Sequence, residues 1–257
     1  MFFRLLLIFI LSGAVSPLPA APALPDSQTI PSTRVPAILV YGDSLSAAYG
    51  IAREQGWVSL LQQRLQSQSY PYQVVNASVS GETTQGGLTR MPATLRQQQP
   101  AIVLIELGAN DGLRGLPVAE MQRNLSAMIE ASQKIKAKVM LIGIQIPLNY
   151  GPRYTREFSE TFPLLAKRYT LPLLPFLLDG VAGKPELTQD DGLHPTAVAQ
   201  KRLLDNVWNV LEPLLENPKC VIKLAARQSP APFPHASPAI RKPRQCPVPR
   251  PEYLHNR

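Results

Sequence analysis

Between residues 37 and 215, short continuous apolar runs alternate with longer segments whose apolar residues recur at helical spacing. A continuous apolar run of about four to eight residues is typical of a strand buried on both faces, as in a parallel sheet. Alternation of such strands with helices predicts an α/β fold, in which helices cover both faces of a mainly parallel sheet. The expected architecture is therefore a three-layer α/β/α arrangement, and no internal repeat is visible.

The predicted strands are 37–41, 72–76, 102–107, 139–146 and 173–176, and the predicted helices lie near 57–65, 88–95, 118–135, 157–169 and 196–215. The last helix carries one apolar stripe, made of Val198, Leu203, Val207, Trp208 and Leu211. Right-handed crossovers place the loops that follow parallel strands at one edge of the sheet. We therefore expect Ser44, Gly81, Asn110 and the loop after Ile146 to gather at that edge.

The N-terminus has the order of features typical of a secretory signal peptide. Arg4 precedes an apolar run over 5–15, and small residues follow at Ala20, Ala21 and Ala23. The run is shorter than the roughly 20 residues that a transmembrane helix needs, although an uncleaved anchor remains the alternative. We predict a signal peptide over 1–23, a leader over 24–36, a folded domain over 37–217, and a periplasmic or secreted location.

The last segment, 218–257, differs in composition from the rest of the chain. It holds eight basic residues and one acidic residue, so it accounts for seven of the eight net positive charges. It is also rich in proline, which predicts a disordered tail. The domain itself is nearly neutral, so no nucleic-acid partner is expected, while the tail can contact an anionic surface weakly. Both cysteines, Cys220 and Cys246, lie in this tail and can pair in an oxidising compartment.

A serine and a histidine carry the chemistry that the sequence predicts. Ser44 follows the apolar strand 37–41 and a glycine, which permits a tight turn into a helix start and an outward-facing hydroxyl. His194 is the only histidine outside the tail, and Asp191 lies three residues before it. An imidazole can take the serine proton when a carboxylate accepts its Nδ1–H and fixes the tautomer. Asp190 is the neighbouring acid, and its side chain is expected to point elsewhere.

Two further blocks can supply hydrogen-bond donors to a developing oxyanion. Gly81 lies in a loop that follows the strand 72–76, and its N–H can face a cleft. Asn110, in Gly108-Ala109-Asn110-Asp111, offers a neutral amide donor, although Asn110 and Asp111 can equally cap the helix that begins near residue 117. Each block alone is also compatible with an ordinary loop.

Taken in order, Ser44, Gly81, Asn110 and His194 resemble the four signature blocks of the SGNH, or GDSL, hydrolase family. Over 37–215 the sequence is similar to the bacterial periplasmic esterases of that family that also act as thioesterases and lysophospholipases. The resemblance implies a flavodoxin-like fold, a Ser44–His194–Asp191 triad, and an oxyanion hole formed by the Ser44 N–H, the Gly81 N–H and the Asn110 amide. It also implies hydrolysis of aryl or alkyl esters, acyl-CoA thioesters and lysophospholipids through an acyl-enzyme on Ser44.

Substrate-binding residues are predicted from the same resemblance, which places Leu113, Ile146, Pro147 and Leu148 at the border of an acyl site. The alternative is that they are ordinary residues at the rim of the core. No metal or cofactor is expected, because glycine-rich phosphate loops and ligand clusters are absent from the sequence. A monomer acting on a small acyl ester or thioester is the expected form. Two rival functions remain open: a carbohydrate O-deacetylase on the same fold, and a non-enzymatic secreted binding protein.

Overall fold

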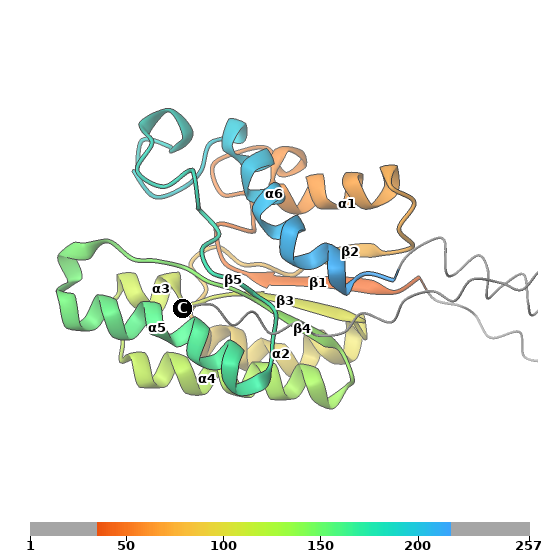
Figure 1. Ribbon diagram of the computed structural model, residues 1–257, viewed down its shortest axis with the longest axis horizontal. Helices are drawn as coiled ribbons and strands as arrows, with labels where there is room; N and C mark the ends of the chain where they lie inside the picture. Colours follow the sequence, from red (N-terminus) through yellow and green to blue (C-terminus); the bar gives the residue numbers. More distant parts are fainter. Residues whose placement is uncertain (1–34, 217–257) are drawn as a thin grey trace, which may run out of the picture. The chain divides into compact units, whose positions relative to one another are not determined.

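The computed structural model describes residues 35–216, and these residues form five strands with helices on both sides (Figure 1). The strands are β1 (Ala37–Gly42), β2 (Gln73–Asn76), β3 (Ile102–Glu106), β4 (Lys138–Ile142) and β5 (Leu173–Leu174). The helices are α1 (Trp57–Ser67), α2 (Thr84–Gln98), α3 (Ala109–Leu113), α4 (Val118–Lys134), α5 (Pro152–Tyr169) and α6 (Gln200–Leu211). Short 3-10 turns span Arg53–Gln55, Leu148–Tyr150, Pro185–Leu187, Ala197–Ala199 and Glu212–Leu214.

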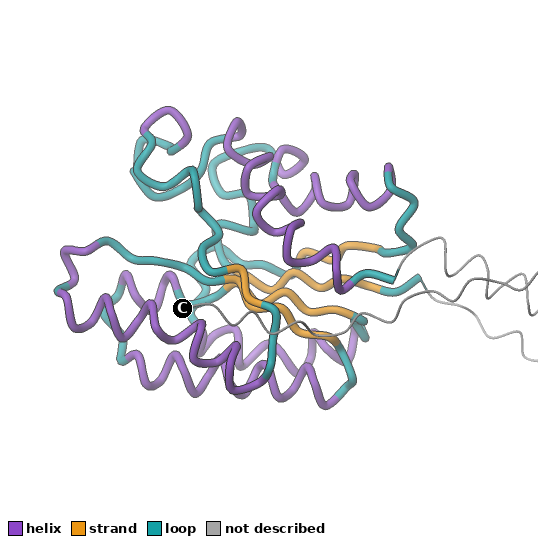
Figure 2. Tube along the Cα trace, viewed as in Figure 1, coloured by secondary structure: helices purple, strands orange, loops and turns teal. Residues whose placement is uncertain are grey.

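All strand pairs are parallel, in the order β2-β1-β3-β4-β5. Helices α1 and α6 pack together on one face, while α2, α4 and α5 cover the other (Figure 2). The predicted three-layer, flavodoxin-like α/β/α fold is therefore confirmed. From β1 the chain adds β2 on one side and then β3, β4 and β5 on the other, so the order of the strands reverses between β1 and β3. Ligands of open α/β sheets bind at the carboxyl ends of the strands beside such a reversal.

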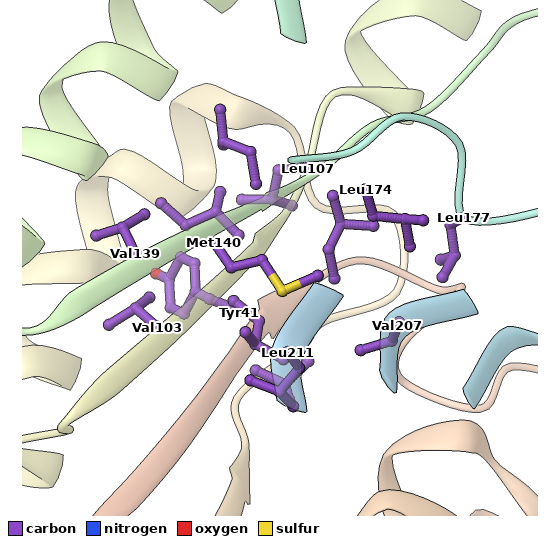
Figure 3. Close-up of a cluster of buried hydrophobic side chains, with 14 of the residues drawn as sticks. Tyr41, Val103, Leu107, Val139, Met140, Leu174, Leu177, Val207 and Leu211 are labelled. Atoms are coloured by element: carbon purple, nitrogen blue, oxygen red, sulfur yellow. The ribbon is translucent and has the colours of Figure 1, made fainter. Parts of the chain in front are cut away.

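The central strands are buried on both faces, which explains their continuous apolar sequences. Every residue of β1 and β3 is buried, and Ile38 to Tyr41 have no exposed surface. Figure 3 shows Val207 and Leu211 of α6 among the side chains that pack around Met140 of β4. Each fully buried aliphatic side chain of this kind stabilises the fold by roughly 1.5–3 kcal/mol.

Several predicted bounds of strands and helices were wrong, and two of the differences concern β4 and the last helix. The fourth strand ends at Ile142 rather than residue 146, and its outer partner β5 ends at Leu174. The pairing loses its register there, because the Gly143 carbonyl accepts the N–H of Leu177 (3.0 Å) and not that of the in-register residue 176. Val198 does not belong to the stripe of the last helix. It lies in a 3-10 turn before α6 and is 78% exposed, whereas Leu203 and Val207 are fully buried.

The predicted signal peptide, the leader up to residue 34 and the basic tail with its cysteines lie outside the described residues. Within 35–216, none of the helices combines the length and the apolar character that crossing a membrane requires.

Candidate active site

Ser44 lies at the carboxyl end of β1 in a tight turn that begins with Asp43. The Asp43 carbonyl accepts hydrogen bonds from the N–H groups of Ser46 (3.3 Å) and Ala47 (2.9 Å), and the Asp43 carboxylate accepts one from Leu45 N–H (3.1 Å). The predicted helix start at Ser44 is wrong. Consecutive turns follow instead, because Ala48 adopts a left-handed backbone conformation (φ +62°) that a helix cannot contain. The turn still leaves the Ser44 side chain partly accessible.

The structure brings Ser44, His194 and Asp191 together as the sequence predicted. Ser44 Oγ lies 2.8 Å from His194 Nε2, and His194 Nδ1 lies 2.6 Å from Asp191 Oδ2. The other Asp191 oxygen accepts the N–H groups of His194 and Leu193, each at 2.9 Å. These two backbone donors lower the pKa of Asp191 to about 2. Asp191 is therefore ionised and orients the imidazole so that Nε2 faces Ser44.

Gln189 connects the histidine loop to the serine turn, a role that the sequence analysis missed. Its backbone N–H donates to the His194 carbonyl (2.7 Å), and its Nε2 donates to the carbonyls of Tyr49 (2.8 Å) and Pro195 (3.0 Å). The Tyr49 ring lies 4.5 Å from the imidazole of His194, centroid to centroid. The contact with Tyr49 joins loops 140 residues apart, so nothing in the local sequence around Gln189 indicates it.

The three residues that carry the predicted oxyanion donors line one cavity beside Ser44. The N–H groups of Ser44 and Gly81 donate no hydrogen bond within residues 35–216, and both residues line the same cavity. Asn110 also lines it, and its Nδ2 is held by Asp43 Oδ2 at 3.2 Å. Asn110 lies on α3, and Asp111 fastens that helix to α2 by accepting the N–H and hydroxyl of Thr84. Asp111 thus caps α2 and not the helix α4, which the sequence analysis had considered.

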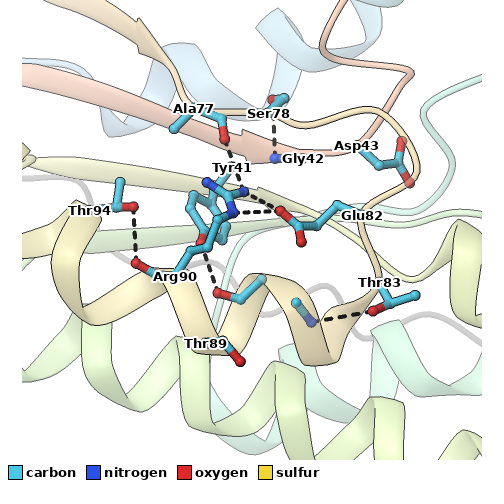
Figure 4. Close-up of polar contacts among 12 residues, drawn as sticks. Tyr41, Gly42, Asp43, Ala77, Ser78, Glu82, Thr83, Thr89, Arg90 and Thr94 are labelled. Carbon is cyan, nitrogen blue, oxygen red and sulfur yellow. Dashed lines mark hydrogen bonds and ion pairs between the residues drawn. The ribbon is translucent and has the colours of Figure 1, made fainter.

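The loop that carries Gly81 is held at both ends by Arg90 of α2 (Figure 4). The Arg90 guanidinium forms an ion pair with Glu82 and donates to the Ala77 carbonyl at 3.2 Å. It also lies 4.8 Å from the centre of the Tyr41 ring. Between these anchors Gly81 adopts φ +78°, a conformation that favours glycine. Arg90 is a second positioning residue that no motif indicated.

The cavity beside Ser44 has a volume of about 210 Å³ and a largely apolar lining. The predicted residues Leu113, Ile146 and Pro147 line it, but Leu148 does not and is 83% exposed. Leu148 begins a 3-10 turn after Pro147, which carries its side chain away from the cavity. Leu193, between the acid and the histidine, also lines the cavity, as its position between them suggests. The lining residues that the sequence analysis did not identify include Tyr49, Ile144 and Leu178.

Comparison with known proteins agrees with this arrangement. Residues 40–202 match the GDSL-like Lipase/Acylhydrolase family. The chain belongs to this family. Membership makes it an acylhydrolase of the GDSL, or SGNH, type, an enzyme that cleaves carboxylic esters or thioesters, and it confirms the resemblance noted in the sequence.

Three similar proteins illustrate the relationship. The chain is 53% identical to Esterase TesA of Pseudomonas aeruginosa over 178 residues, which cover 69% of this chain and 89% of that protein. It is 43% identical to thioesterase 1/protease 1/lysophospholipase L1 of Escherichia coli over 180 residues, which cover 70% and 85%. A crystal structure of TesA superposes with a TM-score of 0.68 at 52% identity, covering 70% of this chain and 99% of that one.

Proposed function

We propose that this GDSL hydrolase cleaves short- to medium-chain carboxylic esters and acyl thioesters through an acyl-enzyme on Ser44. The observation that carries the proposal is the continuous series of contacts from Ser44 Oγ to His194 Nε2 (2.8 Å) and from His194 Nδ1 to Asp191 (2.6 Å). A serine hydroxyl becomes nucleophilic when an oriented imidazole accepts its proton. The apolar cavity beside Ser44 supports an acyl chain as the group that is bound.

In the proposed mechanism Ser44 Oγ attacks the carbonyl carbon while its proton passes to His194 Nε2. The carbonyl oxygen gains the negative charge, and the N–H groups of Ser44, Gly81 and Asn110 stabilise it. When the tetrahedral intermediate collapses, His194 Nε2–H protonates the leaving alkoxide or thiolate. Water then attacks the acyl-enzyme while His194 takes its proton. The second tetrahedral intermediate collapses, His194 returns the proton to Ser44 Oγ, and the acid is released. Asp191 stays ionised throughout and stabilises the imidazolium.

The substrate class follows from the cavity and from the names of the relatives. A lining that includes Leu113, Ile146, Leu178 and Leu193 offers apolar contact to an acyl chain. Proteins named as an esterase, an arylesterase of Vibrio mimicus and a thioesterase/lysophospholipase are similar to the chain. We propose aryl and alkyl esters, acyl-CoA and lysophospholipids as substrates. The exported, monomeric form with a catalytic domain over 37–217 is part of the same proposal.

A substrate panel tests this proposal. Purified protein is assayed on p-nitrophenyl butyrate and octanoate, octanoyl-CoA, a lysophosphatidylcholine and an acetylated xylan, with Ser44→Ala as the matched control. We expect hydrolysis of the esters and the thioester, and none by the control. Cleavage of the acetylated xylan alone would favour the carbohydrate O-deacetylase, and a folded protein without any of these activities would favour a binding protein.

A further inference from the structure

Glu106 is a fully buried carboxyl group that the proposed mechanism does not use. It is the last residue of β3, and its Oε2 accepts hydrogen bonds from the Ser46 hydroxyl at 2.6 Å and from the Asp43 N–H at 3.3 Å. The serine turn is shaped around this group. A Cβ atom added at Gly42 would lie 2.5 Å from Glu106 Oε2, so glycine at this position makes room for the carboxyl.

The surroundings of Glu106 favour its uncharged form. Its second oxygen, Oε1, is buried and accepts no hydrogen bond within residues 35–216, and no lysine or arginine in that range pairs with Glu106 or with the buried Asp43. A bare buried carboxylate oxygen is far more costly than a protonated one. Burial, together with the nearby charge of Asp43, raises the pKa of Glu106 well above its usual value.

Asp43 is the better place for the one negative charge of this pair. It accepts the Leu45 N–H and the Asn110 amide, whereas both donors to Glu106 use a single oxygen. The two carboxyl groups therefore hold one proton between them, on Glu106. An uncharged Glu106 adds no further negative charge beneath the position where the oxyanion forms.

β3 leads directly into α3, which carries Asn110 four residues after Glu106. A contact from Glu106 to the serine turn therefore sets the separation of Ser44 and the Asn110 amide, which both act on the substrate carbonyl in the proposed mechanism. We propose that Glu106 is a positioning residue that, as an uncharged acid, fastens the turn around Ser44 to β3 and so fixes Ser44 relative to Asn110. This inference rests on the proposed acyl-enzyme function.

The test compares Glu106→Gln, Glu106→Leu and Ser46→Ala with wild type that has first been shown to hydrolyse p-nitrophenyl butyrate. The glutamine amide oxygen can accept the same two donors, so Glu106→Gln should keep kcat within about threefold. Glu106→Leu should lower kcat at least about tenfold with KM little changed, since small misplacements can cost up to about a hundredfold. Ser46→Ala removes one of the two contacts and should give an intermediate loss. In Glu106→Leu and Ser46→Ala, the rate at which a fluorophosphonate labels Ser44 should fall in parallel with kcat.

Infrared spectroscopy at pH 7 supplies a readout that a purely structural role would not move. Wild type should show the carbonyl band of a buried protonated carboxyl, and Glu106→Gln should lack it while remaining active. A Glu106→Gln variant as impaired as Glu106→Leu would overturn the proposal, and so would wild-type kcat in folded Glu106→Leu or in Ser46→Ala. If Glu106→Leu does not fold, the Ser46→Ala and Glu106→Gln results decide it. A wild type without esterase activity would instead refute the proposed function.

Discussion

Asn110 gives the most informative single substitution, since its side chain is one of three proposed donors to the oxyanion. Asn110→Ala removes the amide and leaves the Ser44–His194–Asp191 contacts in place. Loss of one such donor typically lowers kcat by about 10²–10³-fold, which corresponds to roughly 2.7–4 kcal/mol of transition-state stabilisation. We expect this loss to fall on kcat, because the amide is aimed at charge that develops only during the reaction.

The same substitution has a separate effect on stability that the structure also predicts. The buried Asp43 carboxylate loses the donor that lies 3.2 Å from its Oδ2 and keeps only the Leu45 N–H. An uncompensated buried acceptor costs about 1–3 kcal/mol. Urea unfolding should therefore show a moderate destabilisation, small enough for the variant to remain folded at 25 °C.

The assay is steady-state hydrolysis of p-nitrophenyl butyrate, with Asn124→Ala as the matched control. Asn124 also donates a single side-chain hydrogen bond, to Thr84 Oγ1 at 3.1 Å, but it does not line the cavity. The control should lose about 0.5–1.5 kcal/mol of stability and keep its kcat within about twofold. A folded Asn110→Ala variant with kcat within about fivefold of wild type would refute the role of the amide, because a single oxyanion donor is worth far more.

Two further substitutions and two pH dependences test other parts of the site. Asp191→Asn presents an amide to His194 Nδ1 and should lower kcat by about 10²–10⁴-fold, measured with the same ester; a loss below about tenfold would contradict the orienting role. Arg90→Met releases both ends of the Gly81 loop and should lower kcat about tenfold with little change in KM. Added guanidinium should restore part of the lost activity. An unchanged kcat would show that the loop keeps its conformation without Arg90. Burial raises the pKa of Asp43 to about 6, so ionisation of Asp43 opposes folding. In urea titrations the free energy of unfolding of wild type, relative to that of Asp43→Asn, should therefore fall as the pH rises from about 4 through about 6. A rise over this range would contradict the assignment. Asp191 has a lowered pKa, so its own contribution should instead be lost as the pH falls from about 4 toward 2.

The fold could be predicted because its signal is repeated along the chain. Each central strand is apolar without interruption, and each helix shows its own apolar face, so errors at single positions did not change the topology. The errors arose at the ends of strands and helices, because contacts with residues distant in the sequence determine where such an element ends. Strand β4 stops early because its pairing with the outer strand loses register at Gly143, and Val198 is exposed because a 3-10 turn precedes α6.

The residues proposed to carry the chemistry could be singled out from the sequence, because their types and order are characteristic of the family. Their supporting contacts could not be predicted in the same way. Gln189 and Arg90 donate to the backbone carbonyls of Tyr49 and Ala77, and any residue type can supply a backbone carbonyl, so the sequence does not indicate these contacts. No role was predicted for Glu106, because its partners Ser46 and Asp43 lie about 60 residues away.

Covalent labelling of Ser44 tests the central claim most directly. Intact protein is treated with a fluorophosphonate, and the modified residue is located by peptide mass spectrometry, with Ser44→Ala and His194→Ala treated in parallel. We predict one adduct, on Ser44, with no labelling of Ser44→Ala and much slower labelling of His194→Ala. A folded wild-type protein that stays unlabelled, or an adduct on Ser80, which lines the same cavity, would contradict the assignment of Ser44 as the nucleophile.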